Sequence, residues 1–301
     1  MGAVAFVFSG QGDQHPGMGK ALCERYPAAE KIFALCDSIR PGTSAQCFSG
    51  TAEELKETAN TQPCLFAMEL AAAQVLLEQG VRPDAVAGFS LGEVAAATVA
   101  GCFDLETGFR LVCKRGELMQ AEAEKHDTAM AAVVKLSAEE VSSLCEKYEG
   151  LYPVNFNCPG QTTVSGLSSQ MAAFSAEVKA AGGRALPLKV KGAFHSPFMA
   201  EAAKSFASEL EKAERRENTV PLYSNVTAEP YMGDPAALLA KQIESPVQWE
   251  KLVRNLIASG IDTFIEIGPG KTLTNMIKKI DGNVRTYSVC DLSVILSEVQ
   301  A

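Results

Sequence analysis

The most constraining feature of this chain is Gly88-Phe-Ser-Leu-Gly92, a G-x-S-x-G pattern between a short apolar run and an alanine-rich stretch. The run at residues 84–87 predicts a buried strand, and the stretch from Gly92 onwards predicts a helix. A turn this sharp needs glycine on both sides of its central residue, and it places the Ser90 hydroxyl at a helix N-terminus that favours an oxyanion. We therefore predict that Ser90 is a nucleophile in an α/β fold. The alternative is a glycine-serine turn that only closes a strand-helix unit.

The composition restricts the compartment and the partners. The 301 residues carry a formal net charge of −9, which argues against nucleic acid because phosphate binding needs a basic surface. The apolar runs are too short to span a bilayer, and the N-terminus enters a strand without a basic leader. Nine scattered cysteines without a C-x-x-C pair, and three histidines without paired spacing, offer little for a metal site. We expect a cytoplasmic protein with reduced thiols, no bound metal, and no nucleic-acid or membrane contact.

Strands and helices alternate in the first part of the chain, which predicts a parallel sheet with helices on both faces. A long apolar helix at residues 63–77 precedes the Ser90 turn, and another helix at 105–124 follows it. We expect a large α/β-hydrolase-like domain with a parallel sheet, formed by residues 1–126 and 196–301.

The pattern changes at about residue 127. Up to residue 195, the expected elements are a strand, a helix, the two strands of a hairpin, a helix and a strand at 184–190, which is the ferredoxin-like βαββαβ motif. Ser137 would begin the first of these helices with a capping box, and Pro159-Gly160 would form the hairpin turn. We expect residues 127–195 to form a small ferredoxin-like subdomain inserted into the large domain. The cleft between the two is then the expected place for a ligand.

A nucleophilic serine needs a base at neutral pH, and the only histidines are His15, His126 and His195. His126 lies in a charged connection, and nothing in the sequence orients His15 in its glycine-rich loop. His195 lies in an apolar loop where the chain leaves the small subdomain, so we predict it as the base; a satisfied core histidine is the alternative. An ordinary α/β-type serine hydrolase carries its acid and histidine late in the chain. About a third of the chain follows His195, which argues against an esterase.

Arg115 lies on the apolar stripe of the helix predicted at 105–124. A buried guanidinium requires an anionic partner. That partner could be a structural carboxylate such as Glu93, or a substrate carboxylate held in a bidentate pair that lysine could not match. The residues leave these two possibilities open.

An ordered set of motifs runs through nearly the whole chain. They are Phe8-Ser-Gly-Gln-Gly12, Thr61-Gln-Pro63, Gly88-x-Ser-Leu-Gly-Glu93, Arg115-Gly-x-x-Met-Gln120, Asn157-x-Pro-Gly-Gln-x-x-Val-Ser-Gly166, Phe194-His-Ser196, Gln242-x-x-x-Pro-Val-x-Trp249 and Glu266-x-Gly-Pro-Gly-Lys-x-Leu273. With this set the chain resembles the malonyl-CoA:acyl carrier protein transacylases and the acyltransferase domains of fatty acid and polyketide synthases.

The resemblance implies ping-pong transfer of a malonyl group from malonyl-CoA to the phosphopantetheine thiol of an acyl carrier protein, with no metal or prosthetic group. Its implied partners are the carrier protein and the coenzyme A thioester. The implied site residues are Ser90 as the acylated nucleophile, His195 as its base, Gln242 as the residue whose carbonyl orients His195, Gln11 and Leu91 as the N–H donors of the oxyanion hole, Arg115 as the partner of the malonyl carboxylate, and Asn157 as a further substrate contact.

One position departs from the family pattern. The family usually has histidine before the serine, whereas this chain has Phe89. The turn needs its glycines rather than that histidine, so the nucleophile is retained. The polarity beside the acyl pocket changes, and with it the rate and the acyl selectivity. An acyl-thioester hydrolase, a trans-acting polyketide acyltransferase with other acyl selectivity, and a non-catalytic carrier-binding module are the alternative functions.

Two further motifs have uncertain roles. Carrier proteins are generally acidic and this chain is acidic too, so docking needs a local basic patch. Arg184, Lys189 and Lys191 form one candidate patch, and Lys278-Lys279 a second; a solvated charged face is the alternative for both. The turn at residues 268–271 could touch coenzyme A phosphates, but a lone short glycine turn is weak evidence for this, and we favour close helix packing as its role.

Overall fold

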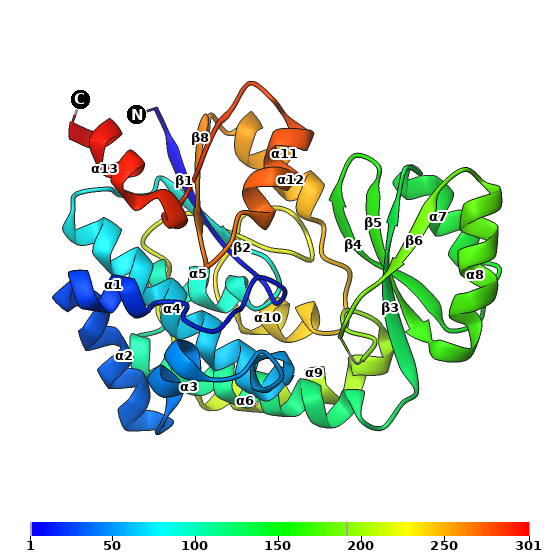
Figure 1. Cartoon of the computed structure of the whole chain (residues 1–301), viewed down its shortest axis with the longest axis horizontal. Coiled ribbons are helices and arrows are strands. Elements are labelled where there is room, and N and C mark those ends of the chain that lie inside the picture. Colours follow the sequence, from blue (N-terminus) through cyan, green and yellow to red (C-terminus); the bar gives the residue numbers. More distant parts are fainter. Residues whose placement is uncertain (1, 191, 301) are drawn as a thin grey trace.

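The computed structural model describes residues 2–190 and 192–300, which form a large unit around a parallel sheet and a smaller unit around an antiparallel sheet (Figure 1). In chain order the elements are β1 (Val4–Phe8), α1 (Lys20–Arg25), α2 (Pro27–Ile39), α3 (Thr43–Ser49), η1 (Glu54–Lys56), α4 (Thr58–Glu78), β2 (Ala85–Gly88), α5 (Gly92–Val99), α6 (Leu105–Ala123), β3 (Thr128–Val134), α7 (Ala138–Cys145), β4 (Leu151–Cys158), β5 (Gln161–Leu167), α8 (Ser168–Ala180), β6 (Arg184–Pro187), η2 (Pro197–Met199), α9 (Ala200–Lys212), β7 (Leu222–Tyr223), α10 (Ala236–Gln242), α11 (Trp249–Ala258), β8 (Thr263–Ile267), α12 (Thr272–Ile280), β9 (Arg285–Ser288), η3 (Val289–Asp291) and α13 (Leu292–Gln300).

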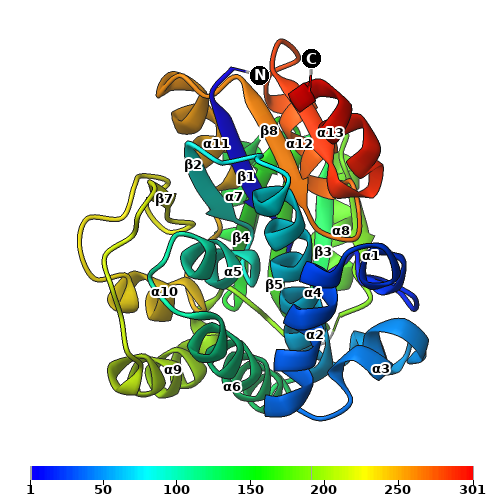
Figure 2. The ribbon, with the colours of Figure 1, turned by 90° about the vertical axis from the view of Figure 1, so that its left-hand side faces the viewer.

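The parallel sheet has the strand order β7-β2-β1-β8-β9, and each neighbouring pair is parallel. Successive side chains of β1 point to opposite faces. Phe6 and Phe8 pack into the core that α4 and α5 cover. Ala5 and Val7 pack into the core that α11 and α12 cover. Figures 1 and 2 show these two pairs of helices on opposite sides of the sheet, so the strands are buried on both faces as the alternating pattern predicts.

The antiparallel sheet has the strand order β4-β5-β3-β6 and is built from β3, α7, β4, β5, α8 and β6 in sequence. Ser137 caps α7 with a complete capping box, as predicted, and the hairpin turns between β4 and β5. Figure 1 shows α7 and α8 on the side of this sheet away from the large unit. The opposite face is turned toward the large unit, where Val247 exchanges backbone hydrogen bonds of 2.9 Å with Val154 and Phe156 of β4.

Two element boundaries differ from those expected. The helix predicted at 63–77 begins at Thr58, five residues before Pro63, because the Thr61 hydroxyl donates to the carbonyls of Leu55 and Glu57 and anchors the first turn. The strand predicted at 184–190 ends at Pro187 as an edge strand. Lys191, a member of the first candidate basic patch, lies outside the described residues. Within the described ranges, no helix is both long and apolar enough to cross a bilayer.

Candidate active site

Ser90 lies on the turn between β2 and α5 and has a backbone φ of 54°, in the left-handed region. Only glycine fits on either side of it. A Cβ on Gly88 would overlap the backbone of Gly92, and a Cβ on Gly92 would overlap the carbonyl oxygen of Phe8. The two glycines therefore let α5 begin directly against β1. This strained turn leaves the Ser90 side chain partly exposed at the carboxyl edge of the sheet.

His195 lies next to Ser90, with its Nε2 atom 2.7 Å from the Ser90 Oγ atom. Its Nδ1 atom lies 2.9 Å from the backbone carbonyl oxygen of Gln242, which can only accept a hydrogen bond. This fixes the proton on Nδ1 and leaves the Nε2 lone pair facing the serine hydroxyl. A backbone hydrogen bond of 3.1 Å from His195 N–H to the Ile243 carbonyl holds the loop in place, and His195 itself has a positive φ of 61°.

The surroundings of His195 favour its neutral form. The ring is only 4% exposed, and burial, followed by the nearby Arg115 charge, lowers the pKa of His195 to about 4. Hydrogen bonds to backbone groups at Gln242 and Ser245 oppose this shift and are smaller in effect. An imidazole with this pKa is unprotonated at neutral pH and can accept a proton from a nucleophile.

Arg115 is buried in α6 and points its guanidinium at the same serine. Its Nη2 atom lies 3.2 Å from Ser90 Oγ and 2.6 Å from the side-chain oxygen of Gln242, and its Nη1 atom lies 2.8 Å from the side-chain oxygen of Gln62. Its Nε atom has no partner among the described residues. Burial lowers the pKa of Arg115 to about 10, so the group remains a cation at neutral pH.

Glu93, the structural carboxylate considered as a partner for Arg115, does not pair with it directly; within the described chain no ion pair joins the two. The amide of Gln242 lies between them, donating from Nε2 to Glu93 and accepting at Oε1 from Arg115. Tyr231 O–H and Asn225 N–H also donate to Glu93. Burial nevertheless raises the pKa of Glu93 to about 7. Arg115 thus has only neutral groups as direct partners.

Asn225 is a site residue that the sequence did not point to. It accepts a 2.7 Å hydrogen bond from the Ser90 N–H and donates a 2.6 Å bond to the Gly88 carbonyl, so it holds the turn from both ends. It follows β7, which pairs with β2 in the sheet. The available signal in the sequence was a polar residue close to the end of β7, the strand that lies next to β2. Gln62 was also missed as a site residue, although its motif was noted.

The two N–H groups expected to form an oxyanion hole lie on loops that approach the turn. Leu91 immediately follows Ser90, and Gln11 follows Gly10, whose α-carbon faces the Phe89 carbonyl. Neither the Gln11 nor the Leu91 N–H donates a hydrogen bond to any other described residue. Both donors are therefore available to an oxygen atom of a ligand.

A cavity of about 220 Å³ lies between these loops and the small sheet. Gln11, Phe89 and Asn157 line it, together with Met276 of α12. Asn157 donates to Thr163 at 3.2 Å, and its side-chain oxygen has no partner within the described part of the chain. The structure thus brings Asn157 to the cavity but gives it no bond to Ser90, His195 or Arg115.

Phe89 forms an apolar part of this cavity wall at the position where the resembled family usually has histidine. Its ring packs edge-on against Trp249 with 5.5 Å between ring centroids. Because phenylalanine stands here in place of a polar ring, this side of the approach to Ser90 is less polar.

The other two histidines lie away from Ser90. His15 lines a separate cavity on the far side of its loop, with Arg25 and Cys290. His126 lies 3.6 Å from Glu122 and stacks edge-on against Phe198. Neither contacts the serine.

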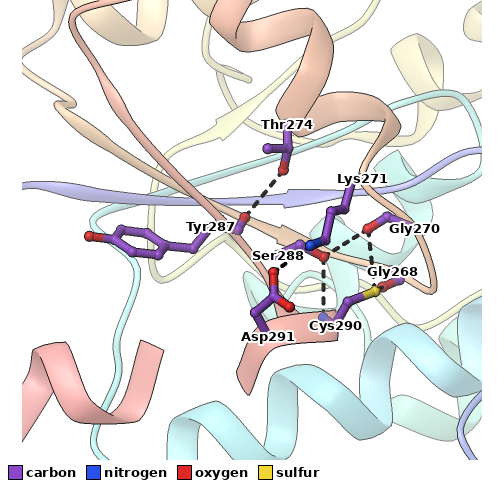
Figure 3. A network of polar contacts seen from close by, with 8 residues as sticks. All are labelled: Gly268, Gly270, Lys271, Thr274, Tyr287, Ser288, Cys290 and Asp291. Atoms are coloured by element: carbon purple, nitrogen blue, oxygen red, sulfur yellow. Dashed lines mark hydrogen bonds and ion pairs between the residues drawn. The ribbon is translucent and has the colours of Figure 1, made fainter. Parts of the chain in front are cut away.

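The turn at residues 268–271 serves packing between β8 and α12. Glu266 accepts the N–H groups of Leu273 and Thr274 at 3.0 and 2.7 Å and so caps the start of α12. Figure 3 shows the carbonyl of Gly270 bonded to Ser288 and the side chain of Lys271 paired with Asp291. The Lys271 side chain and the N–H groups of Leu273 and Thr274 are therefore engaged within the protein.

Comparison with known proteins gives a consistent result. The model of the family described as "Acyl transferase domain" matches residues 5–293. The chain is 39% identical to the malonyl CoA-acyl carrier protein transacylase of Bacillus subtilis, covering 100% of this chain and 97% of that protein. It is 38% identical to the Escherichia coli protein of that name, covering 93% of each. The crystal structure of such a transacylase from Clostridium perfringens superposes with a TM-score of 0.95, at 33% identity, over 99% of this chain and 97% of that one. A malonyl transacylase in complex with a type II polyketide-synthase acyl carrier protein gives a TM-score of 0.95 at 33% identity over 99% of both chains.

Proposed function

The chain belongs to the acyl transferase domain family, and on that premise we propose that it transfers the malonyl group of malonyl-CoA to the phosphopantetheine thiol of an acyl carrier protein. The relatives that carry this activity in their names match over nearly the whole chain. The resulting malonyl carrier protein is the extender thioester of fatty acid biosynthesis. We further propose that the reaction takes place in the cytoplasm and needs no metal or prosthetic group.

One observation carries this proposal: a buried guanidinium with only neutral partners lies 3.2 Å from the nucleophile. Arg115 is 1% exposed, and a buried cation without a counter-charge is costly. The free carboxylate of a malonyl group attached to Ser90 would supply the missing charge. A planar guanidinium can hold that carboxylate through two parallel N–H bonds. An acetyl group would leave the cation unpaired, so the site favours malonyl.

In the first half of the reaction, Ser90 Oγ attacks the thioester carbonyl carbon while its proton moves to Nε2 of His195. The 2.7 Å separation is suited to that transfer. We assign the N–H groups of Gln11 and Leu91 to the oxyanion that forms on the carbonyl oxygen. As the carbon–sulfur bond breaks, His195 returns the proton to the sulfur, and coenzyme A leaves as the thiol. The Gln242 carbonyl keeps His195 in the required tautomer.

In the second half, the carrier thiol gives its proton to His195 and attacks the malonyl ester. The carbon–oxygen bond then breaks, and the proton returns from His195 to Ser90 Oγ. We place the pantetheine arm in the cavity beside Asn157, whose unpartnered side-chain oxygen could accept an amide N–H of that arm. The apolar Phe89 wall and the Arg115 clamp would slow attack by water, which separates transfer from hydrolysis.

The proposal also covers the fold of the two units. We propose that residues 1–126 and 196–301 form an α/β-hydrolase-like domain and that residues 127–195 form a ferredoxin-like subdomain. The nucleophile turn after β2, an inner strand of a parallel sheet, supports the first, and the strand order β4-β5-β3-β6 supports the second.

The test is the fate of isolated malonyl-enzyme. The protein is exposed briefly to malonyl-CoA, freed of excess substrate, and divided between buffer and phosphopantetheinylated carrier protein. We expect the malonyl group to persist in buffer and to move to the carrier within the first measured times. Carrier lacking its phosphopantetheine is the control. Release of free malonate at the same rate with and without carrier would identify a thioester hydrolase and contradict the proposal.

A further inference from the structure

Glu69 is a buried acidic residue that the proposed mechanism does not use. It lies near the middle of α4 and is the only acidic or basic residue between positions 58 and 77. Glu69 is 0% exposed. Its Oε1 atom accepts a 2.6 Å hydrogen bond from the Ser9 hydroxyl, and its Oε2 atom has no partner among the described residues. A buried carboxyl group with one hydrogen bond costs stability, which indicates a role other than packing.

The surroundings of Glu69 favour its neutral, protonated form. Burial raises the pKa of Glu69 well above its ordinary value, and the negative charges of Glu266 and Asp13 act in the same direction. The hydrogen bond from Ser9 opposes this shift and is smaller in effect. A neutral carboxyl group can hold Ser9 without placing a full negative charge behind an oxyanion hole, where such a charge would oppose the oxyanion.

Ser9 joins α4 to the elements that border the serine turn. Its N–H donates a 3.1 Å hydrogen bond to the carbonyl of Ile267 at the end of β8. Its side chain lies against the α-carbon of Gly268, where a Cβ would overlap the Ser9 Oγ atom. Its carbonyl oxygen lies against Gly92, the first residue of α5, where a Cβ would come within 2.5 Å of it. Ser9 is therefore enclosed by α4, by the end of β8 and by the start of α5.

The oxyanion donor assigned to Gln11 follows Ser9 by two residues. Between them, Gly10 lies so close to the serine turn that a Cβ on it would come within 2.8 Å of the Phe89 carbonyl oxygen. The segment from Ser9 to Gln11 thus runs directly over the turn that carries the nucleophile. A shift of Ser9 would move the Gln11 N–H relative to Ser90.

A second anchor holds the other side of Gln11. Asp13 accepts a 2.6 Å hydrogen bond from the Thr272 hydroxyl at the start of α12, so a hydroxyl–carboxyl pair lies on each side of the donor. The pair of Asp13 and Thr272 is exposed, whereas the pair of Ser9 and Glu69 is buried. Water can replace a lost hydrogen bond at an exposed pair, but a buried group is left unpaired. The bond between Ser9 and Glu69 is therefore the anchor that solvent cannot replace.

We propose that Glu69 is a positioning residue of the acyl transfer, and that through its hydrogen bond to Ser9 it sets the place of the Gln11 N–H in the oxyanion hole. The inference rests on the proposed function and adds a residue to its mechanism. Without this bond, Ser9 keeps its backbone hydrogen bond to β8 but loses its link to α4. Because the oxyanion forms only in the transition state, the loss should lower the rate of the chemical step rather than weaken substrate binding.

The experiment uses three substitutions at the buried pair and one control. Glu69→Met removes the acceptor and keeps a side chain of similar size, and Ser9→Ala removes the donor. Glu69→Gln retains a neutral side chain whose oxygen can accept the Ser9 bond, so it should rescue the function. Leu76→Ala is the control, because it deletes a fully buried side chain about two helical turns further along α4.

Each variant is characterised by three measurements. Single-turnover loading at a series of malonyl-CoA concentrations gives the maximal loading rate and the concentration at half of that rate. The NMR signal of the Gln11 amide reports the surroundings of the oxyanion donor. Thermal unfolding reports the stability of each variant.

We expect Glu69→Met and Ser9→Ala each to lower the maximal loading rate by about tenfold or more, which is less than the loss of a whole oxyanion donor. The half-saturating concentration should stay within about twofold of wild type. Combining these two substitutions should lower the rate no further than the more affected single variant, because both remove the same bond.

The other readouts separate positioning from general stability. Glu69→Gln should load within about threefold of wild type, because it retains an acceptor for Ser9. The Gln11 amide signal should shift in Glu69→Met. Leu76→Ala should unfold at a lower temperature, yet match wild type in both kinetic constants and in the Gln11 signal.

Three results would overturn the inference. A maximal loading rate within about twofold of wild type in Glu69→Met or in Ser9→Ala would show that the bond does not serve the reaction. An equal fall in Glu69→Gln and Glu69→Met would show that a neutral acceptor is not what matters. An equal fall in Leu76→Ala would assign the effect to the stability of α4.

If Glu69→Met does not fold, the maximal rates of Ser9→Ala and Glu69→Gln decide the question by the same criteria. Failure of wild type to form any malonyl-enzyme would instead contradict the proposed function itself.

Discussion

Nε2 of His195 lies 2.7 Å from Oγ of Ser90, although 105 positions separate the two residues along the chain. Both residues have left-handed backbone, with φ values of 61° and 54°. Such conformations cost about 1–3 kcal/mol each for non-glycine residues and persist only where the surroundings impose them. Asn225 fixes the serine turn, and the carbonyls of Gln242 and Ile243 fix the histidine. The contact between the two side chains is thus built from two separately held loops.

The titration of His195 provides a first test. Burial lowers its pKa to about 4 from the ordinary value of 6.5, so the ring stays neutral as the pH falls through 6.5 and gains its proton only near 4. Proton-accepting activity should accordingly persist down to about pH 5. NMR of the labelled imidazole rings measures the titration directly, with His195→Ala used to assign the signal. A His195 ring that titrates at its ordinary value would contradict the account.

Arg115→Ala should weaken malonyl loading far more than acetyl loading. Removing one partner of a buried charge pair costs about 2–5 kcal/mol, which corresponds to roughly 30-fold or more in kcat/KM. Arg115→Lys should fall between wild type and alanine, since lysine keeps the charge and loses the planar fork. The control is Arg110→Ala, which removes an exposed arginine of the same helix. The measurement compares loading from malonyl-CoA with loading from acetyl-CoA. An unchanged preference for malonyl would contradict the role of Arg115 as the partner of the malonyl carboxylate.

Glu93→Gln should affect the same preference in the same direction, but less. Glu93 accepts from Gln242 Nε2 and so decides which end of that amide faces Arg115. A glutamine at position 93 allows the Gln242 amide to turn, which removes a hydrogen bond to a charged group, about 1.5–3 kcal/mol. Tyr231→Phe keeps the carboxylate and serves as the control. If Glu93→Gln leaves malonyl and acetyl loading unaltered, Glu93 does not position the clamp.

Gly92→Ala should destabilise the protein, because the new methyl group would overlap the Phe8 carbonyl oxygen. Overpacking of a well-packed core typically costs about 1–3 kcal/mol and sometimes more. Gly282→Ala is the matched control, since its nearest neighbour is an ordinary 3.9 Å away. Thermal and denaturant unfolding measure the difference in the free energy of unfolding. Equal stability of the two variants would show that the turn does not need this glycine.

The parts of the fold that could be predicted are those that local sequence decides. The Ser90 turn, the capping box at Ser137 and the hairpin at residues 159–160 each depend on a few neighbouring residues. The predicted start of α4 was wrong. Pro63 is typical of a helix boundary, but the Thr61 hydroxyl anchors a first turn that begins before Pro63. The resemblance to acyl transferases is confirmed by the family match over residues 5–293.

The site could be predicted only as far as residue chemistry singles out its members. Elimination among three histidines pointed to His195, and the apolar stripe around Arg115 pointed to its burial. Asn225 and the side chain of Gln242 were missed because their roles depend on contacts across 135 to 152 positions of the chain. Amide side chains carry no charge and no spacing rule, so nothing local marks them.

The central claim is that Ser90 becomes acylated because His195 removes its proton. Intact mass after brief exposure to malonyl-CoA, followed by peptide mapping, tests it most directly in wild type, Ser90→Ala and His195→Ala. The account predicts one malonyl group on Ser90 in wild type, none in Ser90→Ala, and strongly delayed loading in His195→Ala. A malonyl group retained by Ser90→Ala, or loading of His195→Ala at the wild-type rate, would contradict it.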